Sequence, residues 1–344
     1  MSNIKGLLKE TRYHDVCDIL KTAGQLGRNE AIEVYAVGGF VRDLLMERDI
    51  NDIDIVAVGK GIPFAEKLAN ELGIKKIVPF KKFGTAIIPN SPIQIEVATA
   101  RTESYEDNSR QPTEVVYTDL KRDLLRRDFT INAMAMDIRP DTFGELLDPF
   151  GGIGDLNENV LRTPLDPDET FSDDPLRMMR AAYFSSKLGF KINNECLESI
   201  ERQAGRIKIV SWERIRDEFI KILKTKKPSI GLTILQKTGL MEIVFPEIHI
   251  MYGMEQTSEW HHKDIFYHTL QVVDNAAQLS EKMELRFAAL VHDIAKPKTR
   301  RIDETKGYTF HGHDAVGERM LNRIARRMKL SNNLKEYLKK ITLL

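Results

Sequence analysis

Polar and apolar residues alternate along NDIDIVAV, residues 51–58, before the segment becomes wholly apolar. Alternation with a period of two predicts a β-strand whose residues i and i+2 point to one face. Asp52 and Asp54 would then lie side by side, and two carboxylates repel unless a cation stands between them. Mg²⁺ suits such a pair because it takes oxygen ligands and keeps positions open for phosphates. Glu96, in the second predicted strand IQIEVATA, could complete the site.

The segment just upstream supports the interpretation of Asp52 and Asp54 as a metal-binding pair. A DxD alone favours an exposed strand with two solvated acids, because short motifs recur by chance. Here an apolar strand at 34–37 runs into Gly38-Gly39 and a helical stretch at 40–46. Glycines at a strand-to-helix turn allow close backbone approach and present N–H groups to a phosphate. With Arg42 as a bidentate partner, the segment predicts a phosphate cradle and nucleoside triphosphate chemistry.

The remaining periodicity divides the chain into a mixed part and a helical part. Short strands and helices alternate from residue 33 to about 148, which predicts an α+β head with a small mixed sheet. After Gly154 the strand signals nearly vanish, and helical patterns such as DPLRMMRAAYFSSKLGF and WERIRDEFIKIL dominate. The sequence ends in an uncapped apolar helical run, SNNLKEYLKKITLL, so we expect more chain to follow it.

The segment RRDFTINAMAM places arginines and an acid before an apolar run that we expect to be helical. Asp128 could accept a hydrogen bond from a ribose hydroxyl, and Arg127 could pair with phosphate. Taken alone, the segment favours a plainer interpretation, a capped helix with surface arginines.

A second polar group lies in FSDDPLRMMRAAYF, on a helix predicted to start near Pro175 after the capping candidates Asp173 and Asp174. Arg177 and Arg180 follow Asp174 at spacings of three and share its helix face. An acid beside a guanidinium offers one acceptor and a fork of donors, which could read the edge of a base. The same spacing alone favours a simple i,i+3 ion pair.

Histidines gather late in the chain. His268 lies in YHTLQVVDN, and His292 and Asp293 follow the apolar run FAALV. Imidazoles together with a carboxylate ligate transition metals, so the set indicates a metal site or its remnant. Each histidine alone could equally be an ordinary core or surface residue. The others are His261, His262, His311 and His313.

Composition limits the partners and the compartment. The 51 basic and 51 acidic residues balance, so net charge argues neither for nor against nucleic acid. Basic clusters such as Lys75-Lys76 and Lys81-Lys82 are interpreted as solvated faces, and aromatic residues are too sparse to indicate a base-stacking platform. Two distant cysteines and the absence of a long apolar stretch predict a cytoplasmic protein with no membrane span.

Together these segments resemble the class II tRNA nucleotidyltransferase and poly(A) polymerase family. VGGFVRDLL with NDIDI resembles its phosphate-cradling and metal-binding signature, RRDFTINAMAM its ribose-reading motif, and DPFGGIGDL its hinge between head and neck. DDPLRMMRAAYFSSKLGF resembles its base-reading motif, and SWERIRDEFIKIL the neck helix that follows. Order and spacing agree over residues 30–225, and the late histidines resemble the HD domain that some bacterial members carry.

The resemblance implies a nucleotidyltransferase head at 1–150, a helical base-reading and RNA-binding neck at 151–245, and a helical HD-like domain at 246–344. It implies Mg²⁺ held by Asp52 and Asp54, with Glu96 assisting catalysis. The nucleotide-binding residues that it implies are Gly38, Gly39, Arg42, Arg127, Asp128, Asn132, Asp174, Arg177 and Arg180. A transition metal in the HD-like domain would use His268, His292 and Asp293.

Two departures from the family pattern stand out. Asp173 occupies a position where the family usually has glutamate, one methylene longer, while Asp174 keeps the base-reading position. The final aspartate of an HD site has no suitable match before Leu344, so the sequence supplies only the first ligands of that site.

The function implied is CCA addition, in which CMP and AMP from CTP and ATP are joined to the 3′ end of tRNA with the protein selecting the base. A poly(A) polymerase of the same family would share every motif quoted. An HD-type metal-dependent phosphohydrolase is the alternative from another class, and the missing final ligand argues against it. Dehydrogenase and P-loop chemistry are excluded, because no GxGxxG opens a helix after the first strand and no GK[ST] follows a glycine loop.

Overall fold

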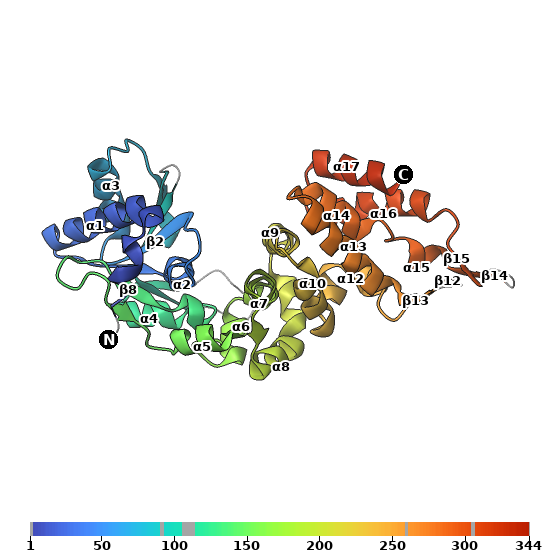
Figure 1. Ribbon diagram of the computed structural model, residues 1–344, viewed down its shortest axis with the longest axis horizontal. Coiled ribbons are helices and arrows are strands. Elements are labelled where there is room, and N and C mark those ends of the chain that lie inside the picture. Colours follow the sequence, from blue (N-terminus) through green and yellow to red (C-terminus); the bar gives the residue numbers. More distant parts are fainter. Residues whose placement is uncertain (1–2, 90–92, 105–113, 259–260, 304–306, 344) are drawn as a thin grey trace. The chain divides into compact units, whose positions relative to one another are not determined.

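The computed structural model describes residues 3–89, 93–104, 114–258, 261–303 and 307–343. The chain forms two compact units, which we call the head unit (Met1–Asp166) and the helical unit (Pro167–Leu344). Figure 1 shows the head unit in blue to green and the helical unit in green to red. No helix among the described residues is both long and apolar enough to cross a membrane. The boundaries at residues 150 and 245 stay predictions.

The head unit mixes helices and strands, as the periodicity predicted. Its helices are α1 (His14–Asn29), α2 (Gly39–Leu45), α3 (Gly61–Glu71), α4 (Leu120–Leu125) and α5 (Gly152–Glu158), with 3₁₀ turns at Lys5–Lys9, Thr11–Tyr13, Lys81–Phe83 and Thr130–Asn132. Its strands are β1 (Glu33–Val37), β2 (Asp52–Val58), β3 (Val78–Phe80), β4 (Thr85–Ile88), β5 (Gln94–Thr99), β6 (Arg101–Ser104), β7 (Glu114–Tyr117), β8 (Ala135–Asp137), β9 (Leu146–Leu147) and β10 (Val160–Leu161).

A mixed sheet of seven strands organises the head unit, in the order β3-β4-β5-β2-β1-β8-β9. Strands β2 and β5 pair in parallel, and their other neighbours in the sheet pair antiparallel. β6 and β7 form a separate two-stranded sheet. The mixed-sheet head is therefore confirmed, and the two strands predicted to carry the acids are direct neighbours.

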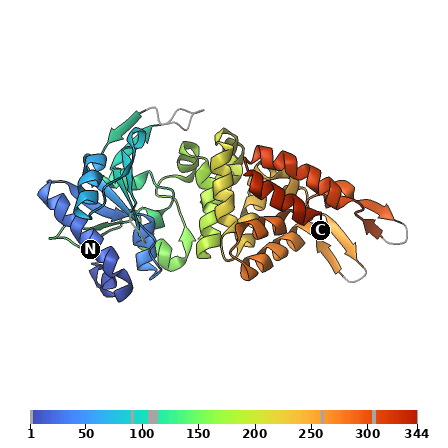
Figure 2. The same ribbon diagram turned by 90° about the horizontal axis from the view of Figure 1, so that it is seen from above.

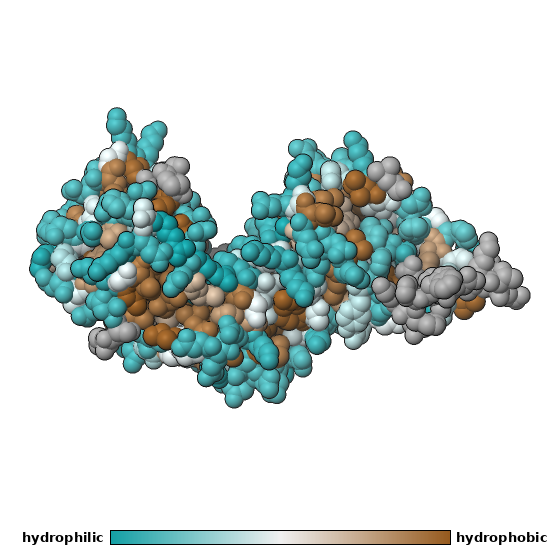
Figure 3. All heavy atoms as spheres, viewed as in Figure 1, coloured by the Kyte–Doolittle hydropathy of each residue, from teal (hydrophilic) through white to brown (hydrophobic). Residues whose placement is uncertain are grey.

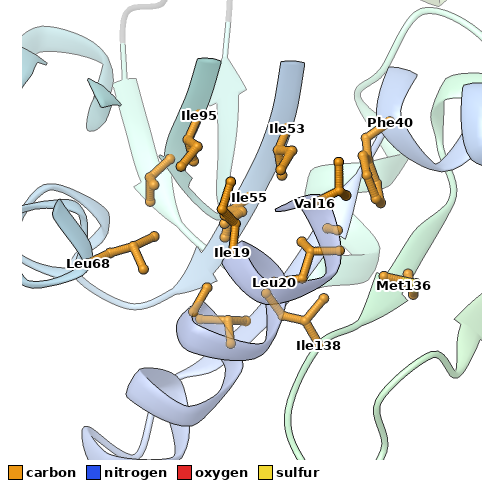
Figure 4. Packing of buried hydrophobic residues seen from close by; sticks show 14 of the residues in the cluster. Val16, Ile19, Leu20, Phe40, Ile53, Ile55, Leu68, Ile95, Met136 and Ile138 are labelled. Carbon is orange, nitrogen blue, oxygen red and sulfur yellow. The ribbon is translucent and has the colours of Figure 1, made fainter. Parts of the chain in front are cut away.

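The main core lies between one face of this sheet and helices α1 and α3. Ile53, Ile55 and Ile95 point from β2 and β5 toward Val16 and Leu20 of α1 (Figure 4). Each fully buried aliphatic side chain of this kind stabilises the fold by about 1.5–3 kcal/mol. Because side chains alternate along a strand, burying the isoleucines turns the acids of β2 to the other face.

The opposite face is only partly covered. Helix α4 packs there through Leu120 and Leu124, against Tyr35 of β1 and Val56 of β2. The part of the face beyond this cluster carries the acidic side chains. The sheet thus has one fully apolar side and one side that is open where the chemistry is expected.

The run after RRDFT does not form the helix that the sequence predicted. It makes a 3₁₀ turn at Thr130–Asn132 and then strand β8, which pairs antiparallel with β1. Ala133 and Ala135 face the α4 side, whereas Met134 and Met136 face the main core. Both faces are apolar because the strand is covered on both sides, so the sequence shows no alternation that would distinguish a strand from a helix.

The helical unit confirms the predicted helical body. Its helices are α6 (Pro167–Asp173), α7 (Leu176–Leu188), α8 (Asn194–Gln203), α9 (Trp212–Leu223), α10 (Pro228–Lys237), α11 (Leu240–Val244), α12 (Pro246–His249), α13 (Ile265–Leu279), α14 (Met283–Val291), α15 (Lys296–Thr299), α16 (His313–Arg327) and α17 (Asn332–Thr342), with a 3₁₀ turn at Ala204–Ile209. Its short strands are β11 (Lys191–Ile192), β12 (Glu255–Ser258), β13 (His261–Asp264), β14 (Arg301–Asp303) and β15 (Gly307–Thr309).

Two β-hairpins in this unit, β12–β13 and β14–β15, were not predicted. They lie side by side at one end of the unit (Figures 1 and 2). Their strands are three or four residues long and mostly polar, so they carry too few apolar positions for an alternating pattern.

Candidate active site

The three predicted carboxylates come together on the open face of the head sheet. In the parallel pairing of β2 and β5, Asp54 is the register partner of Glu96, and Asp52 that of Gln94. Register partners share a face, so Asp52, Asp54 and Glu96 project on the same side. Asp52 is exposed, whereas Asp54 and Glu96 are partly buried. An incoming group can therefore reach all three from solvent.

The electrostatics of this group favour a cation. Burial, together with Asp52 and Glu96, raises the pKa of Asp54 to about 6 against the opposing effect of Arg127 and Arg42. Burial also raises the pKa of Glu96, with Arg101 opposing and Asp52 adding to the effect. Carboxylates that repel each other in a partly desolvated patch are stabilised by a divalent cation with oxygen ligands.

Gly38 brings an arginine close to these acids. Its φ of +67° is rarely adopted by other residues, and it joins β1 to α2. A Cβ at this position would lie 2.6 Å from Arg127 Nη1 and 3.7 Å from Asp54 Oδ2. A side chain would thus displace the guanidinium. At Gly39 a Cβ would meet Arg42 at an ordinary 3.5 Å, so available space alone does not require glycine there.

Arg42 is placed differently from the prediction that it binds phosphate directly. It is buried, and its Nε and Nη2 donate to Asp43 Oδ1 and Oδ2 at 2.9 and 2.8 Å. Its Nη1 donates to Asn132 Oδ1. The guanidinium fork is thus engaged by a neighbouring carboxylate and an amide, and Arg42 orients Asn132. Phosphate binding by Arg42 stays a prediction. The sequence showed Arg42 on the right helix but not which way it points.

Asn132 and Asp128 form the next part of this network. Asn132 Nδ2 donates to Asp128 Oδ1 at 3.0 Å, and the same oxygen accepts the Phe129 N–H at 2.8 Å. Both side chains are buried. The 3₁₀ turn between them places the two polar groups together, so their orientation is fixed before any ligand arrives.

Asp123, which the sequence reasoning missed, anchors two arginines. It is fully buried on α4, and Arg126 Nη2 and Arg127 Nη2 donate to it at 2.9 and 3.1 Å. It also accepts the Arg101 N–H at 3.2 Å. Burial alone would raise its pKa, but Arg127 and Arg126 outweigh burial and lower it. The spacings of three and four residues in DLLRR were a visible signal of this pairing.

In the helical unit, Asp174 lies between two helices. Asp173, proposed as a capping residue, is instead the last residue of α6, because Pro175 interrupts the helix and α7 starts at Leu176. Asp174 Oδ1 accepts the Leu176 N–H at 3.1 Å, and Asp174 Oδ2 pairs with Arg214 Nη2 at 2.8 Å. Arg214 was missed because it comes from α9, and no local pattern reports a contact across 40 residues.

The two predicted base-reading arginines lie on α7. Arg177 Nη1 donates to the Thr170 carbonyl at 3.2 Å. The Arg180 guanidinium lies 5.1 Å from the Phe184 ring centroid, and Arg180 Nη1 is 3.9 Å from Glu218 Oε1. Both arginines share α7 with Leu176, whose N–H Asp174 accepts, and their role in reading a base stays a prediction.

The predicted HD residues also converge. Ligand atoms of His268, His292 and Asp293 all lie within 4.8 Å of one another. Asp293 Oδ2 is 3.1 Å from His292 Nε2 and 2.8 Å from Lys296 Nζ. Burial alone would lower the pKa of His292 and raise that of Asp293. The attraction between the two groups instead raises the pKa of His292 and, together with Lys296, lowers that of Asp293 to about 2.

The remaining histidines do not join this cluster within the described residues. His311 and His313 line a separate cavity of about 500 Å³ with Lys296. The side chains of His261 and His262 lie outside the part of the chain whose side chains the structure describes.

Comparison with known proteins agrees with this geometry. The chain matches the poly A polymerase head domain over residues 34–162, a probable RNA- and SrmB-binding site of polymerase A over 189–251, and the HD domain over 265–343. The multifunctional CCA protein of Vibrio parahaemolyticus is 35% identical over 89% of this chain and 73% of its own length. That of Shewanella frigidimarina is 35% identical over 89% and 72%.

Solved structures give the same result. A CCA-adding enzyme in its apo form I is 27% identical with a TM-score of 0.71, covering 99% of this chain and 72% of that one. A tRNA nucleotidyltransferase complexed with a primer tRNA and an incoming ATP analogue is 27% identical with a TM-score of 0.67, covering 93% and 83%. The chain therefore belongs to the class II tRNA nucleotidyltransferase and poly(A) polymerase family, is a nucleotidyltransferase, and carries an HD domain.

Proposed function

We propose that this nucleotidyltransferase is a CCA-adding enzyme that joins CMP and AMP from CTP and ATP to the 3′ end of tRNA. The observation that carries the proposal is the in-register pairing of Asp54 with Glu96, with Asp52 on the same face. The relatives named multifunctional CCA protein support it, as does the solved relative that holds primer tRNA and an ATP analogue. We also place the protein in the cytoplasm, as its cysteine content predicted.

Mg²⁺ is the metal that these residues fit. The donor set is wholly oxygen, partly exposed, and made of carboxylates whose raised pKa values reflect crowding and burial. Asp52 and Asp54 would hold the ion, with Glu96 beside them. When bound, Mg²⁺ supplies charge stabilisation for the phosphoryl oxygens and lowers the pKa of the attacking hydroxyl.

The protein itself mainly positions the reactants. Arg127, held by Asp123 and admitted by Gly38, lies where it can bind the triphosphate. Asp128 and Asn132, oriented by Arg42 behind them, are proposed to contact the sugar. The tRNA 3′-hydroxyl then attacks the α-phosphorus in line and pyrophosphate leaves, with little covalent work for the protein.

Base selection is assigned to the helical unit. Asp174 offers an acceptor and Arg177 offers donors, and Arg180 supports them from the same helix. A site built to hydrogen-bond one base edge rejects bases that leave its buried polar groups unpaired. Arg214 holds Asp174 in orientation and so belongs to this group as a positioning residue.

The decisive experiment offers tRNA lacking its 3′ terminus together with CTP and ATP. Addition that stops after three nucleotides supports the proposal, whereas a long A tail identifies a poly(A) polymerase. Asp54→Asn should abolish extension. Asp49→Asn, an exposed aspartate in the loop before β2, is the matched control and should extend tRNA like the wild type.

A second site is proposed in the HD domain. His268, His292 and Asp293 offer the imidazole and carboxylate ligands that suit a transition metal. Lys296 competes for the same carboxylate, and the sequence offers no suitable final aspartate. Metal binding there is therefore proposed as weak, and it is separable from the polymerising site by mutation.

A further inference from the structure

A line of register partners runs from the catalytic carboxylates to the edge of the head sheet. Asp54 pairs with Glu96 on β5, Glu96 with Ile87 on β4, and Ile87 with Val78 on β3. Partners on adjacent strands share a face. Val78 therefore lies on the carboxylate face, and Phe80 joins it because residues two apart on a strand point the same way.

This edge carries large apolar side chains that are not buried. Val78, Phe80 and Phe83 are 49%, 42% and 41% exposed, although the opposite face of the same sheet is a closed core. Lys81 and Lys82, both exposed, lie between the two phenylalanines in the turn after β3. We call Val78, Phe80, Lys81, Lys82 and Phe83 the edge shelf. Figure 3 shows hydrophobic residues at the surface of the head unit among hydrophilic ones.

Arg101 connects the edge shelf to the active site. Its guanidinium lies 5.8 Å from the Phe83 ring centroid, while Lys82 Nζ lies 5.9 Å from the same ring. Arg101 also opposes the rise in the pKa of Glu96, so it acts electrostatically on the catalytic group. The edge shelf is thus continuous with the carboxylates, and it combines aromatic faces with positive charge.

Pro79 limits which kind of partner can bind at this edge of the sheet. Proline has no N–H to donate, so β3 is a poor template for another strand. A partner that extends the sheet, including a second copy of this chain, is disfavoured. A partner that lies on the face of β3 and stacks on its rings is not affected. Aromatic rings flanked by lysines are the features that bind single-stranded nucleic acid.

We propose that the edge shelf binds the 3′-terminal nucleotides of the RNA primer, with bases stacked on Phe80 and Phe83 and phosphates near Lys81 and Lys82. This inference rests on the proposed function. Stacking tolerates any base, which suits primers whose ends differ in sequence.

Strand order gives an independent reason for assigning the primer to this side. The triphosphate cradle at Gly38 follows β1, which lies on one side of β2, whereas β5, β4 and β3 lie on the other. In-line transfer places the attacking hydroxyl and the departing pyrophosphate on opposite sides of the α-phosphorus. If pyrophosphate leaves toward β1, the primer must approach from the β5 side, where the edge shelf lies.

The test compares Phe80→Ala/Phe83→Ala and Lys81→Ala/Lys82→Ala with Lys75→Ala/Lys76→Ala. The last pair removes two exposed lysines from the loop before β3 and is the charge-matched control. Binding of tRNA lacking CCA is measured by fluorescence anisotropy, and KM is measured for tRNA, CTP and ATP. Losing both rings should weaken primer binding by about 30-fold or more, because each lost base–aromatic stack weakens binding by about fivefold or more. The KM values for CTP and ATP and the unfolding temperature should stay unchanged.

The lysine pair should act through salt dependence. Loss of two phosphate contacts should reduce the slope of log affinity against log salt by about 1.4 for single-stranded RNA, and the control should leave the slope as in the wild type. If both edge-shelf variants bind the primer as tightly as the wild type, and the wild type adds CCA, primer binding at the edge shelf is refuted. The proposed function is unaffected by that result. Primer binding at the edge shelf is also refuted if the variants raise KM only for CTP or ATP, or if they change the oligomeric state. A wild type that binds tRNA but adds nothing would refute the proposed function instead, while the anisotropy still tests the edge shelf.

Discussion

The Asp123 carboxylate is fully buried, yet it holds Arg127 at 3.1 Å on the open face of the head sheet. The Arg127 side chain is 21% exposed, so one member of the pair is inside the protein and the other reaches the open face. Gly38 leaves room for Arg127, and Asp123 fixes its direction. The direction of the group proposed to bind the triphosphate is thus set by Asp123, a residue that has no proposed contact with the ligand.

Asp123→Asn should reduce both nucleotide affinity and stability. The amide keeps the shape but loses the charge that holds Arg126 and Arg127, and both arginines can turn to solvent. We expect a loss of roughly 1–3 kcal/mol in unfolding free energy, less than for a wholly buried pair. KM for CTP and ATP should rise about tenfold or more. The control is Asp119→Asn, which keeps an N-cap on the same helix and should change neither quantity.

The raised pKa of Asp54 predicts a pH-dependent stability in the metal-free protein. Because the folded-state pKa is about 6, above the usual value near 4, the proton binds the folded state more tightly. The resulting stabilisation is complete below about pH 4 and is lost as pH rises through 6. Asp54→Asn removes the desolvated charge, so at pH 8 in chelator the variant should be more stable, on the order of 2 kcal/mol.

Thermal unfolding from pH 4 to pH 8 checks this prediction. The wild type should lose stability relative to Asp54→Asn between pH 4 and 7, and Mg²⁺ should restore it only in the wild type. Activity should fall below about pH 6, where protons compete with the metal. A stability difference that is independent of pH would show that the surroundings of Asp54 do not raise its pKa.

How far the sequence predicted the site can be judged from particular residues. The alternation around Asp52 and Asp54 predicted a strand with both acids on one face, because that pattern is local and one face is buried. The pairing with Glu96 was anticipated as a possible completion, and the register now places it. The fate of INAMAM was not predictable, because a strand covered on both faces has no alternation.

Tertiary contacts account for the rest. Arg214 reaches Asp174 from another helix, and nothing in either segment reports the encounter. The basic residues at 81–82 were interpreted as a solvated face, as clusters of charge usually are, and aromatic residues appeared too sparse for a base-stacking platform. Only the register across β2, β5, β4 and β3 brings Val78 and Phe80, next to that segment, onto the face of the proposed catalytic acids. The directions of Arg42 and Arg127 likewise depend on Asp43 and Asp123.

Arg214→Ala should relax base selection without abolishing nucleotide transfer. Arg214 pairs with Asp174 at 2.8 Å, and without this partner the carboxylate proposed to read the base is free to rotate. We expect discrimination against UTP and GTP to fall by about tenfold, the value of one charge-assisted hydrogen bond. A four-nucleotide competition on tRNA lacking CCA measures this. Arg202→Ala breaks a pair of equal length, to Asp168, on another helix, and should leave selection intact.

The last prediction concerns Lys296 in the HD domain. Its ammonium lies 2.8 Å from Asp293 Oδ2 and competes with any metal for that ligand. Lys296→Ala should therefore tighten Ni²⁺ binding by about tenfold or more, and His292→Ala should remove it. Because the pKa of His292 is raised, affinity should also weaken as pH falls below neutral, where the imidazole stays protonated.

Calorimetric titration of the chelator-treated protein with Ni²⁺ measures these affinities. Lys298→Ala removes an exposed lysine from the same short helix and is the control for charge. His249→Ala is the control for loss of an imidazole. His249 lies away from the cluster, and its Nδ1 is 3.2 Å from Gln236 Oε1. If Ni²⁺ binds the wild type, Lys296→Ala and His292→Ala equally, the cluster is not the binding site. CCA addition should be unaffected in all four variants, because polymerisation is assigned to the head carboxylates.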